Sequence, residues 1–190
     1  LALALHRVVA ARGPIRTVAL IPWALPTVVA ALLWRFLFDG PTDWLADPIR
    51  AWIPIVLADV WKTTPFVTLL LLAGLQTIDE SLYEAARIDG ATDWQQFRHL
   101  TLPMLRPALL VALIFRTLDA FRVFDLIYAL TGGGPGTATE PISLYAFTVL
   151  LQNLRFGYGS AIGVIVFVVT FGRALLYVRT VGAGLLEEET

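Results

Sequence analysis

The residues best able to do chemistry in this sequence are charged residues that lie inside otherwise apolar stretches. Asp59 and Lys62 are three positions apart, which places both on one side of a helix. Further along, four residues of alternating sign follow one another at the same spacing: Arg116, Asp119, Arg122 and Asp125. Ionisable groups in an apolar environment are costly, so they either pair with one another or line a polar pathway. The pattern therefore indicates a route for a polar molecule, or ion pairs that hold helices together.

Catalytic and metal-binding patterns are absent from the sequence. The phosphate-binding loop of ATPases, GxxxxGK[ST], needs a lysine, and the only lysine, Lys62, follows a tryptophan. The glycine-rich run 132–136 lacks a lysine and is typical of a turn. His6 and His99 are far apart in the sequence and cysteine is missing, so no metal-ligand cluster is predicted. We expect neither an enzyme nor a cofactor or metal on this chain.

The composition is that of a membrane protein. Of the 190 residues, 57% are apolar and 15% are charged, and the mean hydropathy is +0.73. The net charge of −1 gives no basic surface for a nucleic acid. A helix needs about 20 residues to cross the hydrocarbon core. Four stretches meet that length, so the sequence predicts one all-α polytopic transmembrane domain over residues 1–190, with spans at 17–38, 52–75, 104–130 and 160–178.

The distribution of arginine predicts which loops face the cytoplasm. One side carries eight arginines: Arg7, Arg12, Arg16, Arg87, Arg98, Arg106, Arg173 and Arg179. The other side carries only Arg50 and Arg155. The positive-inside rule then places the loop 76–103 and the C-terminus in the cytoplasm, and loops 39–51 and 131–159 outside. The short apolar stretch 1–11 is interpreted as the end of an earlier helix, and the chain as a fragment that lacks N-terminal helices.

The loop 76–103 is long for a connection between two spans, which indicates structure of its own. Ser81 and Glu84 have the spacing of a capping box, and Gly90 follows as a left-handed helix end. A second turn is predicted after it, with aromatic and apolar residues on one side. Two interpretations stay open: a knob that docks on another protein, or an amphipathic loop on the membrane surface.

The same loop carries a resemblance to a known family. Glu84-Ala85-Ala86, three residues, Gly90, nine residues and then Leu100-Thr101-Leu102-Pro103 resemble the EAA motif of permease subunits of binding-protein-dependent ABC importers. The one departure is Leu100, where the motif has isoleucine. The flanking segments WKTTPF and LTGGGP resemble the maltose and trehalose type of carbohydrate permease. The resemblance implies the helical bundle of an ABC importer permease, called MetI-like.

The resemblance also implies partners and a role for the loop. In this family the loop couples the permease to a cytoplasmic ABC ATPase dimer, which holds ATP and magnesium, while the permease itself carries no cofactor. The residues implied in coupling are Glu84, Ala85, Ala86, Gly90, Leu100, Leu102 and Pro103. A second homologous permease subunit, an extracytoplasmic sugar-binding protein, the sugar substrate and membrane lipid are the other expected partners. The location implied is the cytoplasmic (inner) membrane of a prokaryote, with several spans.

Depth in the membrane suggests which charged residues line the pathway. Lys62 and Arg116 each lie about 20 Å from the cytoplasmic loop, at about 1.5 Å per helical residue. Together with Asp119 and the ring of Phe66 they would form a polar chamber with an aromatic wall, which suits a sugar. Counting without gaps from Glu84, the resemblance implies sugar contacts at Lys62, Thr63, Phe66, Arg116, Asp119, Ala120 and Val123.

The substrate implied is a disaccharide such as trehalose or maltose, imported by alternating access. The family has mostly neutral residues where this chain has Lys62, Arg116 and Asp119, which argues against maltose itself. The segments WKTTPF and RTLDAFR resemble the trehalose branch most, and an anionic sugar phosphate is the alternative. The rival interpretation is that Lys62 and Asp119 simply pair with each other across the helices. Two other classes of function remain: an ion-coupled secondary transporter that uses Asp59, Asp119 and Asp125, and a purely structural membrane subunit.

Overall fold

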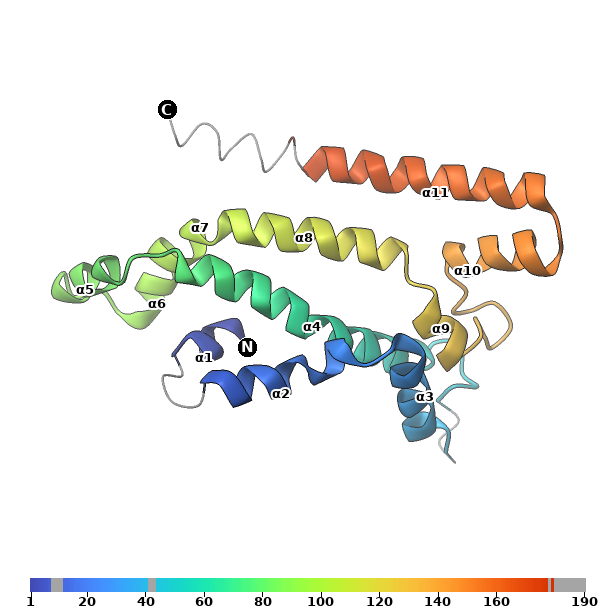
Figure 1. Ribbon diagram of the computed structural model, residues 1–190, viewed down its shortest axis with the longest axis horizontal. Helices are drawn as coiled ribbons and strands as arrows, with labels where there is room; N and C mark the ends of the chain where they lie inside the picture. Colours follow the sequence, from blue (N-terminus) through green and yellow to red (C-terminus); the bar gives the residue numbers. More distant parts are fainter. Residues whose placement is uncertain (8–11, 41–43, 178, 180–190) are drawn as a thin grey trace. The chain divides into compact units, whose positions relative to one another are not determined.

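The computed structural model describes residues 1–7, 12–40, 44–177 and 179, and every regular element in this part of the chain is a helix (Figure 1). The order is α1 (Ala2–Arg7), α2 (Arg12–Ala24), α3 (Thr27–Phe38), α4 (Trp52–Gln76), α5 (Glu80–Ile88), α6 (Asp93–Gln96), the π-helical η1 (Phe97–Thr101), α7 (Leu102–Met104), α8 (Arg106–Phe121), α9 (Asp125–Leu130), α10 (Ile142–Phe147), the π-helical η2 (Thr148–Gln152) and α11 (Phe156–Tyr177).

Two helices are long and apolar enough to cross a membrane as single elements. Among the described residues these are α4, with 25 residues, and α11, with 22. They occupy the stretches predicted as the second and fourth spans. Two further pairs of helices would each cross a membrane only if both members count as one bent span. These pairs involve the first and third predicted spans.

The first and third predicted spans are not continuous helices, so it stays a prediction that each crosses the membrane as one bent span. The stretch 17–38 breaks between α2 and α3, which meet at 93°. The break falls at Pro26, which has no amide hydrogen and disfavours helical geometry in the residue before it. The stretch 104–130 is interrupted after Phe121, and a short helix, α9, begins at Asp125.

The chain forms two compact units. The first comprises Leu1–Leu20, Phe66–Arg116 and Leu176–Thr190, and the second comprises Ile21–Pro65 and Thr117–Leu175. In the first unit, apolar residues of α1, the end of α4 and the start of α8 form the core: Ala2, Leu75, Ile78 and Leu105, with Leu71, Tyr83, Ala108 and Leu109 packed around them. This core supports the cytoplasmic loop.

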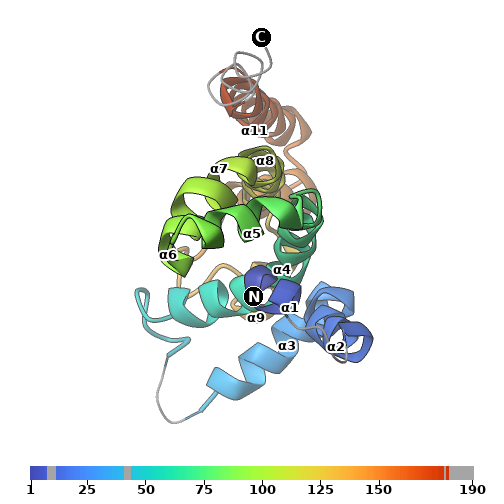
Figure 2. The same ribbon diagram turned by 90° about the vertical axis from the view of Figure 1, so that its left-hand side faces the viewer.

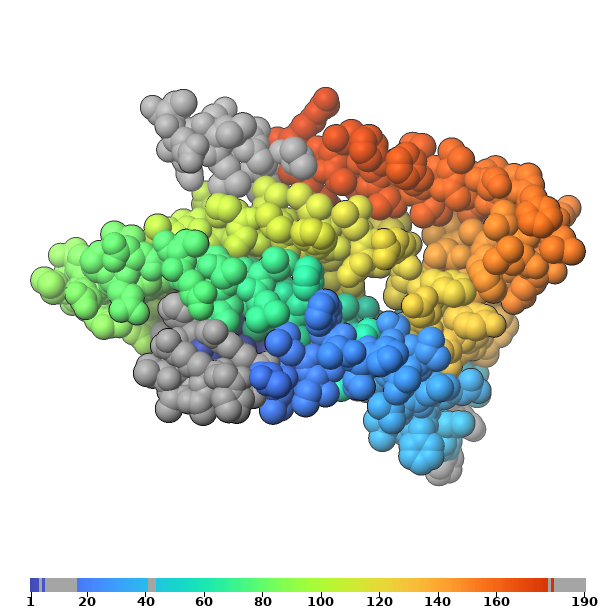
Figure 3. Space-filling view, in the orientation of Figure 1, coloured from blue at the N-terminus to red at the C-terminus, as the bar shows by residue number. Residues whose placement is uncertain are grey.

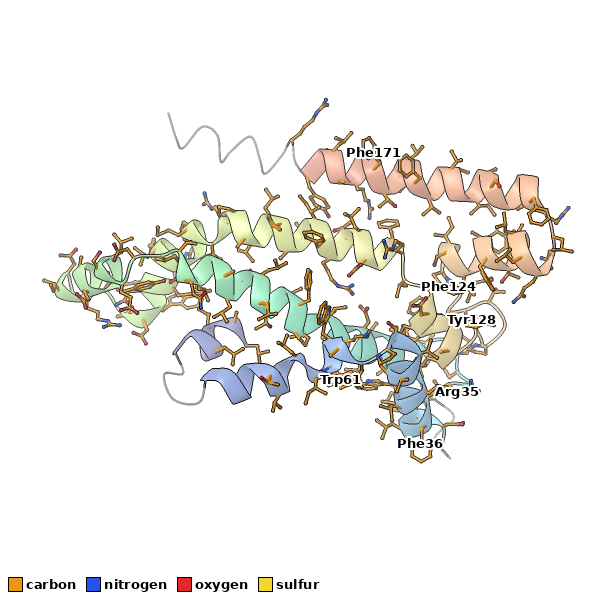
Figure 4. All side chains as sticks on the ribbon, in the orientation of Figure 1. Arg35, Phe36, Trp61, Phe124, Tyr128 and Phe171 are labelled. Atoms are coloured by element: carbon orange, nitrogen blue, oxygen red, sulfur yellow. The ribbon has the colours of Figure 1, made fainter. Side chains whose placement is uncertain are left out.

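The second unit is built around the packing of α3 on α9. Its buried core comprises Ala31, Ile55, Ala58, Leu126, Ile127, Leu130 and Leu144. Aromatic rings extend this core, and Phe124 packs on both Tyr128 and Phe147 with centroid distances of 5.4 and 4.9 Å. Figure 4 labels Phe124 and Tyr128 side by side at α9. Within residues 131–159, where the sequence analysis predicted only a turn at 132–136, the structure has the helices α10 and η2.

Within the first unit, α4 and α8 approach each other closely at Gly74. A Cβ atom at this position would lie 2.5 Å from the Cβ of Ala108 and 3.1 Å from a methyl group of Leu105. Real Cβ atoms do not approach that closely, so only glycine fits unless the helices move apart. The contact fixes the distance between the two helices that lead into the cytoplasmic loop.

We therefore expect Gly74→Ala to destabilise the protein by about 1–3 kcal/mol, the usual penalty of overpacking. The measurement is the thermal unfolding midpoint in mild detergent. The matched control is the double variant Gly74→Ala with Ala108→Gly, which removes the facing methyl group and should recover most of the loss. An unchanged midpoint in the single variant would contradict the close approach.

Candidate functional site

The loop 76–103, which the sequence predicts to be cytoplasmic, is a compact pair of helices, α5 and α6–η1, in the first unit. In Figure 2 this loop faces the viewer, with α5 beside α6. Asp79 is the N-cap of α5, and its carboxylate accepts a hydrogen bond from the Ser81 amide at 2.9 Å. The predicted capping box of Ser81 and Glu84 is therefore wrong. Asp79 caps the amide of Ser81, so α5 begins at Glu80, two residues earlier than a Ser81 cap requires.

The end of α5 has the predicted left-handed turn. Gly90 has a φ of +78°, its amide donates to the Arg87 carbonyl at 3.1 Å, and the Ala91 amide donates to the Ala86 carbonyl at 2.9 Å. These two bonds make a Schellman motif, which satisfies carbonyls that the helix end would leave free. The chain therefore leaves α5 in one defined direction.

The second helix of the pair is tied to the first by buried polar groups. Thr92 and Gln95 form the capping box that begins α6. The buried side chain of Gln96 donates to the Ala91 carbonyl at 2.9 Å. The Tyr83 hydroxyl on α5 lies 3.0 Å from the Thr101 hydroxyl at the end of η1. Satisfied buried polar contacts of this kind hold the two helices in one arrangement.

Two hollows open on this helix pair. The larger, of about 1040 Å³, is lined by charged and aromatic side chains that include Glu80, Glu84, Arg87, Asp93 and Trp94. The smaller, of about 360 Å³, includes Ala86, Gly90 and Leu100. Beside them, Ile88 is 86% exposed and Trp94 is 66% exposed. An exposed aromatic and an exposed isoleucine beside charged residues are typical of a surface that binds another protein.

The residues predicted to couple the chain to an ATPase differ in how exposed they are on this surface. Glu84 and Ala85 are exposed, Ala86 and Leu100 are half-buried, and Gly90 forms the turn described above. Leu102 is exposed and Pro103 is half-buried in α7, where the chain enters α8. The sequence analysis did not predict the residues whose hydrogen bonds hold the pair together: Asp79, Tyr83, Gln96 and Thr101. Tyr83 and Thr101 are far apart in sequence, so their contact leaves no local pattern.

The predicted pathway residues fall in both compact units, so their meeting in one chamber stays a prediction. In the second unit, the Lys62 ammonium donates to the carbonyl of Leu25 at 2.6 Å, at the break between α2 and α3, and interacts electrostatically with Asp125. Among the described residues, no hydrogen bond or ion pair joins Lys62 to Asp119. The Thr63 hydroxyl donates to the Asp59 carbonyl of its own helix at 2.7 Å.

The other predicted pathway residues are placed as follows. In the first unit, the ring of Phe66 packs edge-on against Phe115, next to Arg116, at a centroid distance of 5.9 Å. In the second unit, Asp119 and Ala120 are exposed near the end of α8. Val123 lies in the break between α8 and α9, and its carbonyl accepts a hydrogen bond from the Ser143 hydroxyl. Ser143 was not predicted from the sequence.

The two helix breaks in the second unit are stabilised in the same way. At each break a carbonyl is released from a helix, and a side chain from another helix donates to it: Lys62 of α4 at Leu25, and Ser143 of α10 at Val123. Backbone groups without partners are costly in a membrane, and irregular backbone there is found where it is buried in protein or lines a cavity. The two hydrogen bonds can hold the broken backbone in a defined geometry.

The pH dependence of the Asp79 cap follows from its hydrogen bonds. The Ser81 amide and hydroxyl hold the pKa of Asp79 below its ordinary value. Since the folded-state pKa is the lower one, the cap contributes fully above the ordinary aspartate pKa of about 3.9 and is lost as the pH falls through the lowered value. We expect the protection of the Ser81 and Leu82 amides from hydrogen exchange, corrected for intrinsic rates, to fall in that range. Asp79→Asn keeps an acceptor and should remove the pH dependence; if the variant and the wild type titrate alike, another group is responsible.

The role of Lys62 at the bend can be tested in the absence of any ligand. Lys62→Met leaves the Leu25 carbonyl without its donor, which should destabilise the protein by about 1–3 kcal/mol. We expect a lower thermal midpoint in detergent, a smaller decrease for Lys62→Arg, and little change for the control Thr63→Val, because Thr63 bonds only to its own helix. A Lys62→Met variant as stable as the wild type would show that the ammonium does not hold the bend.

Several curated proteins are similar to this chain. The trehalose/maltose transport system permease protein MalF of Thermococcus litoralis is 50% identical over 94% of this chain and 65% of its own length. The trehalose transport system permease protein SugA of Mycobacterium tuberculosis is 43% identical over 96% of this chain and 62% of its own length. The sulfoquinovosyl glycerol transport system permease protein SmoG of Agrobacterium fabrum is 41% identical, over 88% of this chain and 59% of its own length. This chain therefore spans about two thirds of these relatives or less.

Solved structures have the same fold. The crystal structure of a bacterial ABC transporter involved in the import of the acidic polysaccharide alginate matches with a TM-score of 0.84 and 25% identity, over 96% of this chain and 70% of that one. A second structure, of the bacterial alginate ABC transporter in complex with an alginate pentasaccharide-bound periplasmic protein, matches with a TM-score of 0.79 and 26% identity over 93% and 67%. The predicted helical fold of an ABC importer permease is confirmed.

The family described as "Binding-protein-dependent transport system inner membrane component" matches residues 1–180. The relatives are permease proteins of transport systems, which agrees with the expectation that the chain is not an enzyme. The match includes the EAA-type loop and all four predicted spans. The chain belongs to the family of inner-membrane components of binding-protein-dependent transport systems.

Proposed function

We propose that this chain is a permease subunit of an ABC importer that carries a disaccharide, trehalose first and maltose second, into the cell by alternating access. The observation that carries the proposal is the combination of an EAA-type loop, folded as the rigid α5–α6 pair, with 50% identity to a trehalose/maltose permease. Relatives that transport trehalose support the sugar class, while the similarity to SmoG keeps an anionic sugar derivative as the alternative.

The proposed coupling surface is the exposed side of the α5–α6 pair. A cytoplasmic ABC ATPase dimer would bind ATP and magnesium and receive α5 in a groove on its surface. Glu84 and Arg87 offer charges of both signs, and Ile88 and Trp94 offer apolar surface, which is a composition suited to a protein interface. The Tyr83–Thr101 contact and the Gly90 turn support a mechanical role, because a pair that does not deform can pass a displacement to α4 and α8.

The proposed substrate pathway lies along α4 and α8. Lys62, Thr63, Phe66, Arg116, Asp119, Ala120 and Val123 are its proposed lining residues. Hydroxyl groups of a sugar need donors and acceptors, and a ring face packs well on an aromatic side chain such as Phe66. A second homologous permease would complete the chamber, and an extracytoplasmic sugar-binding protein would deliver the substrate from outside. The alginate transporter in complex with its periplasmic protein is a precedent for the last partner.

The test is uptake of labelled trehalose by vesicles that contain the full-length chain with its co-purifying subunits. We expect uptake to need internal ATP and the binding protein, and to survive an ionophore that collapses ion gradients. Unlabelled maltose should compete and a sugar phosphate should not. Uptake that stops when the gradient collapses, and needs no ATP, would favour the ion-coupled transporter and rule out the ABC importer.

A charge reversal at Glu84 tests the coupling surface directly. Glu84→Lys places a cation where α5 would meet the ATPase, and loss of a central interface residue weakens binding by at least about tenfold. We expect the ATPase to be lost on purification and trehalose uptake to stop, while the second permease is retained. The same charge change at Glu140, in the predicted outer loop, is the control and should leave ATPase recovery unchanged. Full recovery of the ATPase with Glu84→Lys would contradict the proposed docking surface.

A further inference from the structure

Helix α5 has little packing of its own. It is nine residues long and none of its residues is buried. Figure 3 shows α5, in green at the left of the view, at the surface. Helices of this length are marginal when they stand alone, so the position of α5 depends on specific contacts. The Asp79 cap and the Gly90 turn fix its two ends relative to the adjoining chain, and the polar contact between Tyr83 and Thr101 joins it to η1.

Tyr83 connects α5 to two other parts of the first unit. Its ring packs on the buried core around Leu75 and Leu105. Its hydroxyl lies 3.0 Å from the hydroxyl of Thr101, a residue that is only 4% exposed. A hydrogen bond that is shielded from water is stronger than an exposed one, and losing a partner there is costly. The position of α5 relative to η1 therefore depends on this contact.

A wide turn in η1 brings Thr101 to the buried side. The Leu102 amide donates to the Phe97 carbonyl, five residues earlier, where a regular α-helix bonds four residues back. In a regular helix, Gln96 and Thr101 would lie about 140° apart around the axis. Here both are buried, and the Thr101 hydroxyl also donates to the Gln96 carbonyl at 3.4 Å. The turn thus holds Thr101 where Tyr83 reaches it, and π-helical turns of this kind are frequent at functional sites.

Thr101 is connected in turn to the start of α8. Its carbonyl accepts a hydrogen bond from the Leu105 amide at 3.0 Å, and the Leu105 carbonyl accepts one from the Leu109 amide at 2.9 Å. Leu105 is buried beside Gly74, where α4 and α8 approach each other closely. A continuous series of contacts therefore runs from α5 through Tyr83 and Thr101 into α8, which is the kind of network that can carry coupling.

We propose that Tyr83 and Thr101 are positioning residues that pass a displacement of α5 on to α8, and that they act separately from the residues that bind the ATPase. The inference rests on the proposed function, in which α5 docks on an ATPase. Glu84, the proposed docking residue, is exposed, whereas Tyr83 beside it is half-buried and packs on the core. Loss of the hydroxyl contact therefore leaves the ATPase bound but weakens the link between ATP hydrolysis and transport.

The test uses vesicles that contain the full-length chain with its co-purifying subunits, supplied with ATP, the binding protein and labelled trehalose. The measured quantity is trehalose transported per ATP hydrolysed, which does not depend on how much of the protein is folded. Tyr83→Phe removes the hydroxyl and keeps the ring. We expect full recovery of the ATPase and a ratio about fivefold lower, the factor that one net hydrogen bond supports. Thr101→Val should lower the ratio as much, while Thr101→Ser keeps a hydroxyl and should retain the wild-type ratio.

The double variant Tyr83→Phe with Thr101→Val shows whether the two residues act through one contact. Its ratio should be no lower than that of either single variant, because the first change already removes the contact that the second would remove. The control is Thr77→Val, at a threonine whose hydroxyl donates to the Gly74 carbonyl at 2.8 Å. This variant also loses a hydroxyl near the loop, but it should transport as much trehalose per ATP as the wild type.

Three results would overturn the inference. The first is an unchanged ratio in Tyr83→Phe, the second is a double variant whose loss is the product of the two single losses, and the third is release of the ATPase by Tyr83→Phe, which would make Tyr83 a docking residue. If Tyr83→Phe does not assemble, Thr101→Val and Thr101→Ser decide, and equal ratios in these two would contradict a role for the hydroxyl. Wild-type uptake that needs no ATP would overturn the proposed function and this inference with it, whereas ATP-dependent uptake with unchanged ratios overturns this inference alone.

Discussion

A backbone carbonyl that leaves a helix inside a membrane has no water to bind, and this constraint governs the second unit of the protein. Each unpaired group would cost several kcal/mol, so a broken span persists only where another group donates to the freed carbonyl. The chain meets this condition twice, with the Lys62 ammonium at Leu25 and the Ser143 hydroxyl at Val123. The packing of α3 on α9 brings the elements on the far sides of both breaks together. A break whose free carbonyl has a donor is a position where a transporter can bend without unfolding.

In the α5–α6 pair, hydrogen bonds have the opposite effect. Its polar groups are used to prevent bending: Asp79 fixes the start of α5, the Gly90 turn fixes its end, and the Tyr83–Thr101 contact joins the two helices. A coupling element must keep its shape when a partner pushes on it, whereas a pathway must change shape. Helix α4 connects the break at Leu25 with the α5–α6 pair. It carries Lys62 near its middle and ends at Gln76, shortly before α5.

The sequence predicted those features that depend on local spacing or on composition. The EAA spacing, the left-handed turn at Gly90 and the apolar stretches that became α4 and α11 are of this kind. Pro26 indicates the break between α2 and α3. The break was not predicted because the stretch 17–38 is predominantly apolar and was judged by its mean hydropathy. The break after Phe121 contains neither glycine nor proline, and it depends on Ser143, which is distant in sequence. Tertiary hydrogen bonds of this kind leave no periodic pattern in the sequence. For the same reason the sequence did not predict that Lys62 bonds to Leu25 and interacts with Asp125 rather than with Asp119.

The engagement of Lys62 also bears on the choice between a neutral and an anionic sugar. An uncommitted lysine in a low-dielectric chamber would attract an anion strongly. Here the ammonium already donates to a carbonyl and faces the carboxylate of Asp125, while Asp119 adds an exposed negative charge on the same unit. Lys62 is therefore not an uncommitted cation, which weakens the argument for a sugar phosphate that the sequence drew from this residue. Recognition of a neutral disaccharide would depend instead on its hydroxyl groups, each of which can both donate and accept a hydrogen bond.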